Sequence, residues 1–169
     1  MADGRVEDRL TLLYVAHYRR LVRLAAQLTA DLDGAEEVVQ DAYVKVARRW
    51  RGLRDHERAE AYLRQAVVNL ARSRVRHRAV MERHAPHSRD DGPDAASAET
   101  GAMAHLRARA VLDALAELPH RQREALVLRY YADLSEAQIA ESMGISAGAV
   151  KSHASRGLAA LRPMLADQP

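Results

Sequence analysis

The sequence predicts an all-α protein made of two small helical domains joined by a flexible linker. Apolar residues recur at helical spacing throughout residues 8–83, and the first proline is Pro86. Residues 84–104 are rich in Pro, Gly, Ser, Asp and Ala, a composition typical of linkers. After them, residues 105–165 read as short helices, the first two separated at Pro119. We therefore expect a helical bundle at 8–83, a linker at 84–104 and a four-helix unit at 105–165.

The composition indicates a folded cytoplasmic protein with an uneven charge distribution. The 169 residues are 48% hydrophobic, enough for compact cores. The absence of cysteine, of a membrane-spanning apolar run and of a signal pattern at the start of the sequence favours the reducing cytoplasm. The net charge is only +3, but residues 31–41 hold five acids and no base, whereas residues 64–78 hold five arginines and no acid. We expect one surface to meet a basic partner and another to meet a phosphate backbone.

A helix is expected from about Asp33 to Trp50, starting with a capping box formed by Asp33 and Glu36. A rotation of 100° per residue gives this helix an apolar face and a polar face. A solvated polar face is the more frequent arrangement, but Val44 amid polar groups is typical of a protein interface. The expected core face is Ala35, Val38, Val39, Ala42, Tyr43, Val46 and Trp50, and the opposite face is Glu37, Gln40, Asp41, Val44 and Arg48.

A second helix is expected from about Arg58 to Arg78, with Leu63, Val67 and Leu70 packed inward. Its arginines at 72, 74, 76 and 78 spread over a wide arc, which suits phosphate binding. Cations favoured by the helix dipole are the alternative, but they explain only one or two arginines. Asn69, if buried, needs partners, most simply backbone groups of the preceding loop, which could then form a pocket for an unstacked base.

The second domain contains a helix-turn-helix signature at residues 135–156. Ser135 and Gln138 fit a capping box, Gly144 supplies a positive-φ turn, and Ser146 caps the next helix. Ala140 and Val150 occupy the positions where this motif needs a small residue and an apolar anchor. The pattern predicts a helix that enters the DNA major groove.

Three segments together resemble bacterial RNA polymerase sigma factors. These segments are YRRLVRLAAQLTADLDGAEEVVQDAYVKVARRW, AYLRQAVVNLARSRVRHR and LPHRQREALVLRYYADLSEAQIAESMGISAGAVKSHASRGLAALR. The chain is most similar to the short extracytoplasmic-function (ECF) group of the sigma-70 family. The resemblance implies a region 2 domain followed by a region 4 domain, and a subunit that binds core RNA polymerase and directs initiation through the −10 and −35 promoter elements.

The resemblance also implies roles for individual residues. The EEVVQDA segment would dock on the clamp helices of the largest polymerase subunit, with the flap of the second subunit as a further partner. An anti-sigma factor is a further partner that the resemblance makes plausible. The implied polymerase contacts are Glu37, Gln40 and Asp41, with Val44 on the same face. The implied −10 contacts are Arg51, Arg54, Asn69, Arg72, Arg74 and Arg76. The implied −35 contacts are Arg129, Lys151, Ser152, His153, Ser155 and Arg156.

Two departures from the family bear on promoter choice. Relatives often carry longer side chains where this sequence has Ala154, Ser155 and Gly157, so we expect the recognition helix to read fewer base edges. The sequence has no Phe and one Trp, so we expect weaker duplex melting and stricter promoter choice than in primary sigma factors.

Two other classes of function agree less well with this sequence. A helix-turn-helix regulator of the response-regulator type would not replace a sigma factor, and its α/β receiver would show strands, which residues 8–83 lack in pattern. An enzyme would need a catalytic or metal-binding constellation. His77, His84 and His87 could suggest a metal site, but they lie at a helix end and in the linker without a second shell of ligands. We therefore expect no catalytic residues, no metal and no cofactor.

Overall fold

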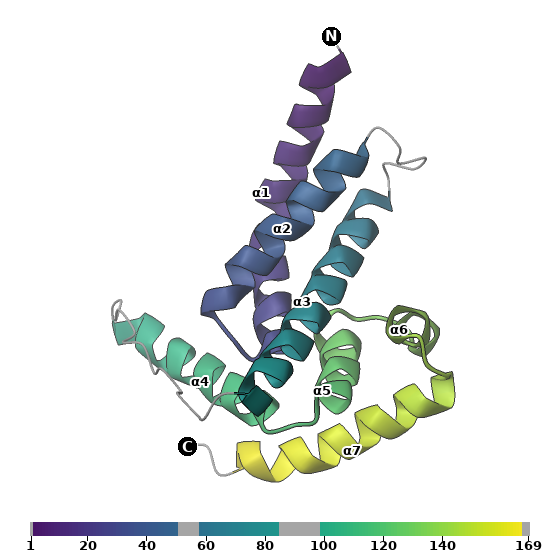
Figure 1. Ribbon diagram of the computed structural model, residues 1–169. Coiled ribbons are helices and arrows are strands. Elements are labelled where there is room, and N and C mark those ends of the chain that lie inside the picture. The colour runs from purple at the N-terminus through teal and green to yellow at the C-terminus, as the bar shows by residue number, and fades with distance from the viewer. Residues whose placement is uncertain (1, 51–57, 85–98, 167–169) are drawn as a thin grey trace.

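The computed structural model describes residues 2–50, 58–84 and 99–166, and the side chains within 8–50, 58–84 and 103–166. All the regular structure in these residues is helical, with no strand, which confirms the all-α prediction (Figure 1). The elements are α1 (Ala2–Thr29), α2 (Asp33–Arg49), α3 (Ala59–His84), α4 (Glu99–Ala116), α5 (His120–Leu126), η3 (Val127–Tyr131), α6 (Glu136–Met143) and α7 (Ala147–Ala166).

Helices α1, α2 and α3 pack into the first bundle, with α2 and α3 antiparallel in Figure 1. Leu63 and Val67 of α3 are fully buried, as the helical periodicity predicts, while Leu70 is half-buried. The predicted core face of α2 is likewise confirmed, because six of its positions are buried and Tyr43 is partly buried. Periodicity alone therefore identified the faces of α2 and α3 that form the core of this bundle.

Helices α4 to α7 form the second unit, which ends in the helix-turn-helix of α6 and α7. Pro119 takes an extended ψ of 136° just before α5, and the chain continues from α5 into the π-helical turn η3. Ile139 of α6 and Val150 of α7 are fully buried. These two side chains anchor the two helices of the motif in the core of the unit.

The start of α2 differs from the prediction. Asp33 does not cap the helix, since the N-cap position is Leu32 and no side chain bonds there. Instead, Asp31 Oδ1 accepts a hydrogen bond of 3.2 Å from Gly34 N. The chain leaves α1 through Ala30 in the left-handed conformation, with a φ of 53°, and this sharp turn precedes Asp31. The capping carboxylate therefore comes from a residue two positions earlier than the local pattern indicates.

Helix α4 begins at Glu99, inside the segment 84–104 that the composition assigns to the linker. Residues 99–104 contain Glu, Met and two Ala, which are good helix formers and outweigh the single Gly101. His84 is the last residue of α3. The remainder of the expected linker, 85–98, lies outside the described residues.

The two helical units pack against each other. Figure 1 shows α5 and α6 beside the carboxy-terminal half of α3, and one continuous cluster of buried side chains includes Leu28 of α1, Val68 of α3 and Leu128 of η3. Polar contacts join the same elements, as described below. The two units thus share an interface in addition to the covalent connection.

Candidate polymerase-binding and DNA-binding surfaces

The outer face of α2 presents the acidic surface that the sequence predicts. Glu37, Gln40, Asp41 and Val44 are all exposed, and Val44 is 48% accessible although it is apolar. Because the inner face of α2 is fixed in the bundle core, these four side chains project together from one rigid helix. The arrangement suits an apolar contact surrounded by groups that pair with basic residues.

Three tyrosines hold α2 against α1. The Tyr43 hydroxyl donates a 3.0 Å hydrogen bond to the Leu13 carbonyl, and the Tyr14 ring lies 4.5 Å from the Tyr18 ring and 5.1 Å from the Tyr43 ring. Burial, together with the neighbouring tyrosines, raises the pKa of Tyr43 to about 12, so its hydroxyl remains a donor. This cluster fixes the orientation of the helix that carries the acidic surface.

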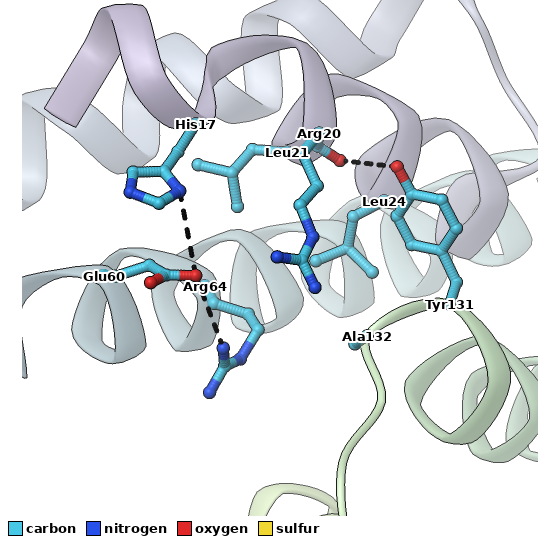
Figure 2. A pocket seen from close by; sticks show the side chains of 8 residues that line it. All are labelled: His17, Arg20, Leu21, Leu24, Glu60, Arg64, Tyr131 and Ala132. Atoms are coloured by element: carbon cyan, nitrogen blue, oxygen red, sulfur yellow. Dashed lines mark hydrogen bonds and ion pairs between the residues drawn. The ribbon is translucent and has the colours of Figure 1, made fainter.

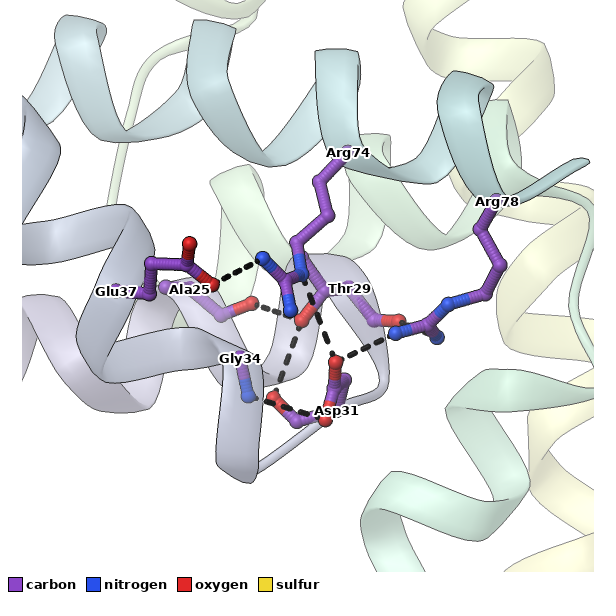
Figure 3. A network of polar contacts seen from close by, with 7 residues as sticks. All are labelled: Ala25, Thr29, Asp31, Gly34, Glu37, Arg74 and Arg78. Atoms are coloured by element: carbon purple, nitrogen blue, oxygen red, sulfur yellow. Dashed lines mark hydrogen bonds and ion pairs between the residues drawn. The ribbon is translucent and has the colours of Figure 1, made fainter. Parts of the chain in front are cut away.

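A network of carboxylates and arginines joins α3 to the start of α2 (Figure 3). Arg74 Nη1 lies 2.7 Å from Glu37 Oε2, Arg74 Nε lies 3.7 Å from Asp31 Oδ2, and Arg78 also pairs with Asp31. The Arg74 guanidinium rests on the backbone of Gly34, where an added Cβ would stand 2.3 Å from Nη2. A side chain at residue 34 would therefore displace the Arg74 guanidinium from this position.

The arginines of α3 are less available for phosphate binding than the predicted wide basic arc implies. Arg74 and Arg78 pair with the carboxylates just described, and Arg72 pairs with Glu124 of α5. Arg76 is exposed. The sequence contains both the arginines and the carboxylates, but it does not show which of them pair. The pairings depend on how α2 and α5 pack on α3.

Asn69 is exposed, so the condition of burial, under which it would need partners in the preceding loop, is not met. It lies next to the buried Val68 on α3, and one step of 100° turns its side chain away from the core. Its Oδ1 accepts hydrogen bonds from Gln65 Nε2 at 3.1 Å and Arg72 Nη1 at 3.3 Å. The loop itself, with Arg51 and Arg54, lies outside the described residues.

The caps of the helix-turn-helix are confirmed. Ser135 Oγ accepts from Gln138 N at 3.2 Å, while Ser135 N donates to Gln138 Oε1 at 2.9 Å. Gly144 ends α6 with a φ of 63°, and Ser146 Oγ accepts from Ala149 N at 3.1 Å. These bonds satisfy backbone donors that would otherwise lack partners at the two helix starts.

Helix α7 exposes most of the residues that the sequence proposes for DNA contact. Lys151, Ser152, Ser155 and Arg156 are exposed, and His153 is half-buried. Arg129 of η3 is half-buried, with its Nη2 3.6 Å from Glu136 Oε2. The proposed residues of α7 thus form one accessible stretch, with Arg129 paired to the start of α6.

Two of the three short residues in α7 face inward, which corrects the expectation drawn from them. Ala154 and Gly157 are buried, and a Cβ on Gly157 would stand 2.8 Å from Leu126 Cδ1 of α5. The small size of Gly157 serves the packing of α7 on α5, and Ala154 lies in the core. Of these three residues, only Ser155 is exposed. Ala154 and Gly157 face inward, so their small size does not reduce the number of positions that can read bases.

Replacing Ser135 by alanine is expected to destabilise the second unit by about 0.5–2 kcal/mol, because the backbone N–H of Gln138 loses its acceptor. Urea unfolding followed by circular dichroism measures the change. Ser73→Ala, an exposed substitution in α3, is the matched control and should stay within about 0.5 kcal/mol. Equal losses in the two variants would contradict a capping role for Ser135.

One functional candidate was missed in the sequence. Glu124 lies in the apolar stretch REALVL and is buried, as is its neighbour Arg123, which donates to the Leu115 carbonyl at 3.3 Å. Two adjacent charged residues at core positions of a helix are unusual and could have indicated a polar interdomain contact. Glu124 pairs with Arg72, one of the residues proposed for DNA binding.

Two features are absent from the described residues. No group of three or more His, Cys, Asp or Glu side chains is arranged to hold a metal ion in that part of the chain. Nor does any helix in it combine the length and apolar character needed to cross a membrane.

The chain resembles known proteins over nearly its whole length. Residues 13–80 match the family Sigma-70 region 2, and residues 108–161 match the family Sigma-70, region 4. It is 34% identical to the RNA polymerase sigma-E factor of Streptomyces avermitilis, over 86% of this chain and 78% of that protein. It is 32% identical to the ECF RNA polymerase sigma factor SigL of Mycobacterium tuberculosis, over 92% of this chain and 88% of that protein.

The fold is also found in solved structures. The sigma factor RpoE of Bartonella quintana, solved in complex with the anti-sigma factor NepR, superposes with a TM-score of 0.72 at 25% identity over the full length of both chains. The order of the two matched regions, the helical fold and the curated relatives all agree. This chain therefore belongs to the extracytoplasmic-function group of the sigma-70 family of bacterial RNA polymerase sigma factors.

Proposed function

We propose that this sigma factor joins core RNA polymerase through the outer face of α2 and directs it to promoters through DNA contacts of α3 and α7. The proposal rests on one observation: a single chain combines the exposed acidic face around Val44 with a fully capped helix-turn-helix. Such a subunit lends promoter specificity and needs no catalytic groups of its own. Its place of action is the cytoplasm, where the polymerase works.

On the polymerase side, the proposed contacts are Glu37, Gln40, Asp41 and Val44, and the proposed partners are the clamp helices of the largest subunit. Asp41 would pair with basic side chains while Val44 is covered, and Glu37 would do so once released from its ion pair with Arg74. The flap of the second subunit is the partner proposed for the region 4 unit. An anti-sigma factor is a further proposed partner, supported by the complex in which the similar sigma factor RpoE was solved.

On the DNA side, the −10 element is assigned to α3 and the loop before it. Asn69 and Arg76 are exposed and accessible to a DNA strand, whereas Arg72 and Arg74 are paired with carboxylates in the structure. Arg51 and Arg54 complete this proposed set. The −35 element is assigned to α7, where Lys151, Ser152, His153, Ser155 and Arg156 would contact the major groove while Arg129 contacts the backbone.

Transcription with purified components tests the proposed function. The full chain is mixed with core polymerase and genomic DNA, and the 5′ ends of the transcripts are sequenced. We expect initiation at a limited set of sites that share two upstream elements. Transcription that requires a second sigma factor would favour the helix-turn-helix regulator. That alternative is not supported by the match of residues 13–80 to region 2 or by the helical structure described there.

Arg76→Ala is expected to weaken promoter binding by the holoenzyme and to reduce its salt dependence. If Arg76 neutralises one phosphate, the slope of log Kobs against log salt should become less steep by about 0.9. The measurement is a titration of promoter DNA at several salt concentrations. Arg9→Ala removes a similar exposed charge from α1 and serves as the control. Identical slopes for the two variants would contradict a phosphate contact by Arg76.

A further inference from the structure

We propose that the free sigma factor is held closed by the contact between Arg72 of α3 and Glu124 of α5, and that this contact withholds Arg72 from promoter DNA until the two units separate. The inference rests on the proposed function of Arg72. It concerns the interdomain seam, defined here as the surface where α1 and α3 meet α5, η3 and α6.

The contact has the geometry of a directed, multiply bonded ion pair. Arg72 Nε lies 3.2 Å from Glu124 Oε1 and 3.4 Å from Oε2, and Arg72 Nη2 also bonds Oε1. The Glu124 side chain is only 7% exposed and that of Arg72 is 21% exposed. A carboxylate this deeply buried depends on its cationic partner, because leaving it unpaired away from water costs several kcal/mol.

The same guanidinium ties a third helix into the contact. Arg72 Nη2 donates a 3.0 Å hydrogen bond to the Ser142 carbonyl of α6, the first helix of the helix-turn-helix. One side chain of region 2 thus holds two helices of region 4. While it does so, its nitrogen atoms are occupied by protein acceptors and are not free to bind a phosphate.

A second contact closes the seam on the side of α1 (Figure 2). The Tyr131 hydroxyl, at the end of η3, donates a 3.1 Å hydrogen bond to the Arg20 carbonyl. Leu24 of α1 lies beside the Tyr131 ring and is buried. This contact involves no residue proposed to bind DNA, so it can be altered independently of the DNA-binding surfaces.

The Glu124 carboxylate lies among several cations and offsets their mutual repulsion. Arg78 of α3 lies across the seam from Arg123 of α5; burial chiefly, and then Arg78, lowers the pKa of the Arg123 guanidinium. His120 and Arg121 lie on the same side of the seam as Glu124. Without the Glu124 charge, these cations would repel one another, and the two units would separate.

The closed form is incompatible with simultaneous binding of both promoter elements. Centres at −10 and −35 stand roughly 25 base pairs apart, or about 85 Å along a duplex at about 3.4 Å per pair. In the closed chain, Arg72, assigned to the −10 element, touches α6 of the motif assigned to the −35 element. The units therefore have to move apart, and that movement frees Arg72.

The distance between the units can be measured directly in the free, full-length chain. Because the sequence has no cysteine, cysteines placed at the exposed Ala16 of α1 and Ala159 of α7 give one specific pair of fluorescent labels. Glu124→Gln is expected to shift the labels to longer distances. Glu117→Gln removes the same charge from an exposed site and should leave the distances unchanged. Tyr131→Phe should also open the seam, with Arg72 and Glu124 intact.

Binding to a random-sequence DNA duplex provides the second measurement. Freed Arg72 should add about one phosphate contact, so Glu124→Gln should steepen the slope of log Kobs against log salt by about 0.9. Glu117→Gln changes the net charge equally but frees no arginine, and its slope should match that of the wild type. The difference between the two variants separates unmasking of Arg72 from a general change in charge.

The proposal is supported if Glu124→Gln and Tyr131→Phe both lengthen the distance and both steepen the slope, while Glu117→Gln does neither. It is overturned if the folded variants keep the wild-type distances, or if the wild-type chain is already open. Should Glu124→Gln fail to fold, Arg72→Gln removes the other partner of the same ion pair: longer distances support the proposal, and wild-type distances overturn it. None of these measurements uses polymerase, so failure of the proposed function would show separately in the transcription assay.

Discussion

Asp41→Arg is expected to abolish binding of this sigma factor to core polymerase while leaving its fold intact. Asp41 is exposed on the same face of α2 as Glu37 and Val44. Reversal of its charge replaces an attraction to basic residues of the partner with a repulsion, and a juxtaposition of like charges in an interface costs several kcal/mol. A loss of affinity of at least about 100-fold corresponds to about 2.7 kcal/mol.

The measurement is a titration of labelled sigma factor with core polymerase, followed by fluorescence anisotropy. Asp113→Arg makes the same reversal at an exposed site on α4 and should bind normally. Arginine is a good helix former, so the far-ultraviolet circular dichroism of both variants should match that of the wild type. Normal binding by the Asp41 variant would exclude this face of α2 as the polymerase-binding surface.

Leu63→Ala is expected to have the largest effect on stability. Leu63 is fully buried at the centre of the bundle formed by α1, α2 and α3. Removing three carbons from such a site costs about 2–5 kcal/mol, from the lost burial and from the cavity left behind. Domains are stable by only about 5–15 kcal/mol in total, so much of the folded state of region 2 would be lost.

Urea unfolding of the full chain, followed by circular dichroism, measures this change. Leu12→Ala is the matched control, because the Leu12 side chain is 68% exposed and its truncation should change stability by less than about 0.5 kcal/mol. Polymerase binding at physiological temperature should fall for the Leu63 variant and remain for the Leu12 variant. Similar unfolding midpoints for both would contradict the central position of Leu63 in the core.

Local rules predicted the parts of the molecule that local interactions determine. The capping box at Ser135, the left-handed Gly144 and the second cap at Ser146 involve residues within a few positions of each other, and all three are observed. The two faces of α2 followed from periodicity in the same way. The all-α fold could be predicted from these patterns, and the family from the resemblance of three segments that lie in the order of the two matched regions.

The features that were not predicted depend on contacts between distant residues. Arg72 and Glu124 are separated by 52 positions, and Arg74 and Glu37 by 37, so no local pattern relates them. The buried position of Gly157 depends on how closely α5 approaches α7. The sequence thus identified candidate charged residues, while the packing of the helices decides which of them are accessible.

The inward orientation of Ala154 and Gly157 sets a limit on how promoter preference can be redesigned. A side chain at 157 would collide with Leu126 of α5, and a large one at 154 would not fit in the core, so a library aimed at new −35 sequences should leave both unchanged. Diversity belongs at 151, 152, 155 and 156, which are open to solvent. Successful variants from a fully randomised helix should therefore retain small residues at 154 and 157, whatever bases they come to recognise.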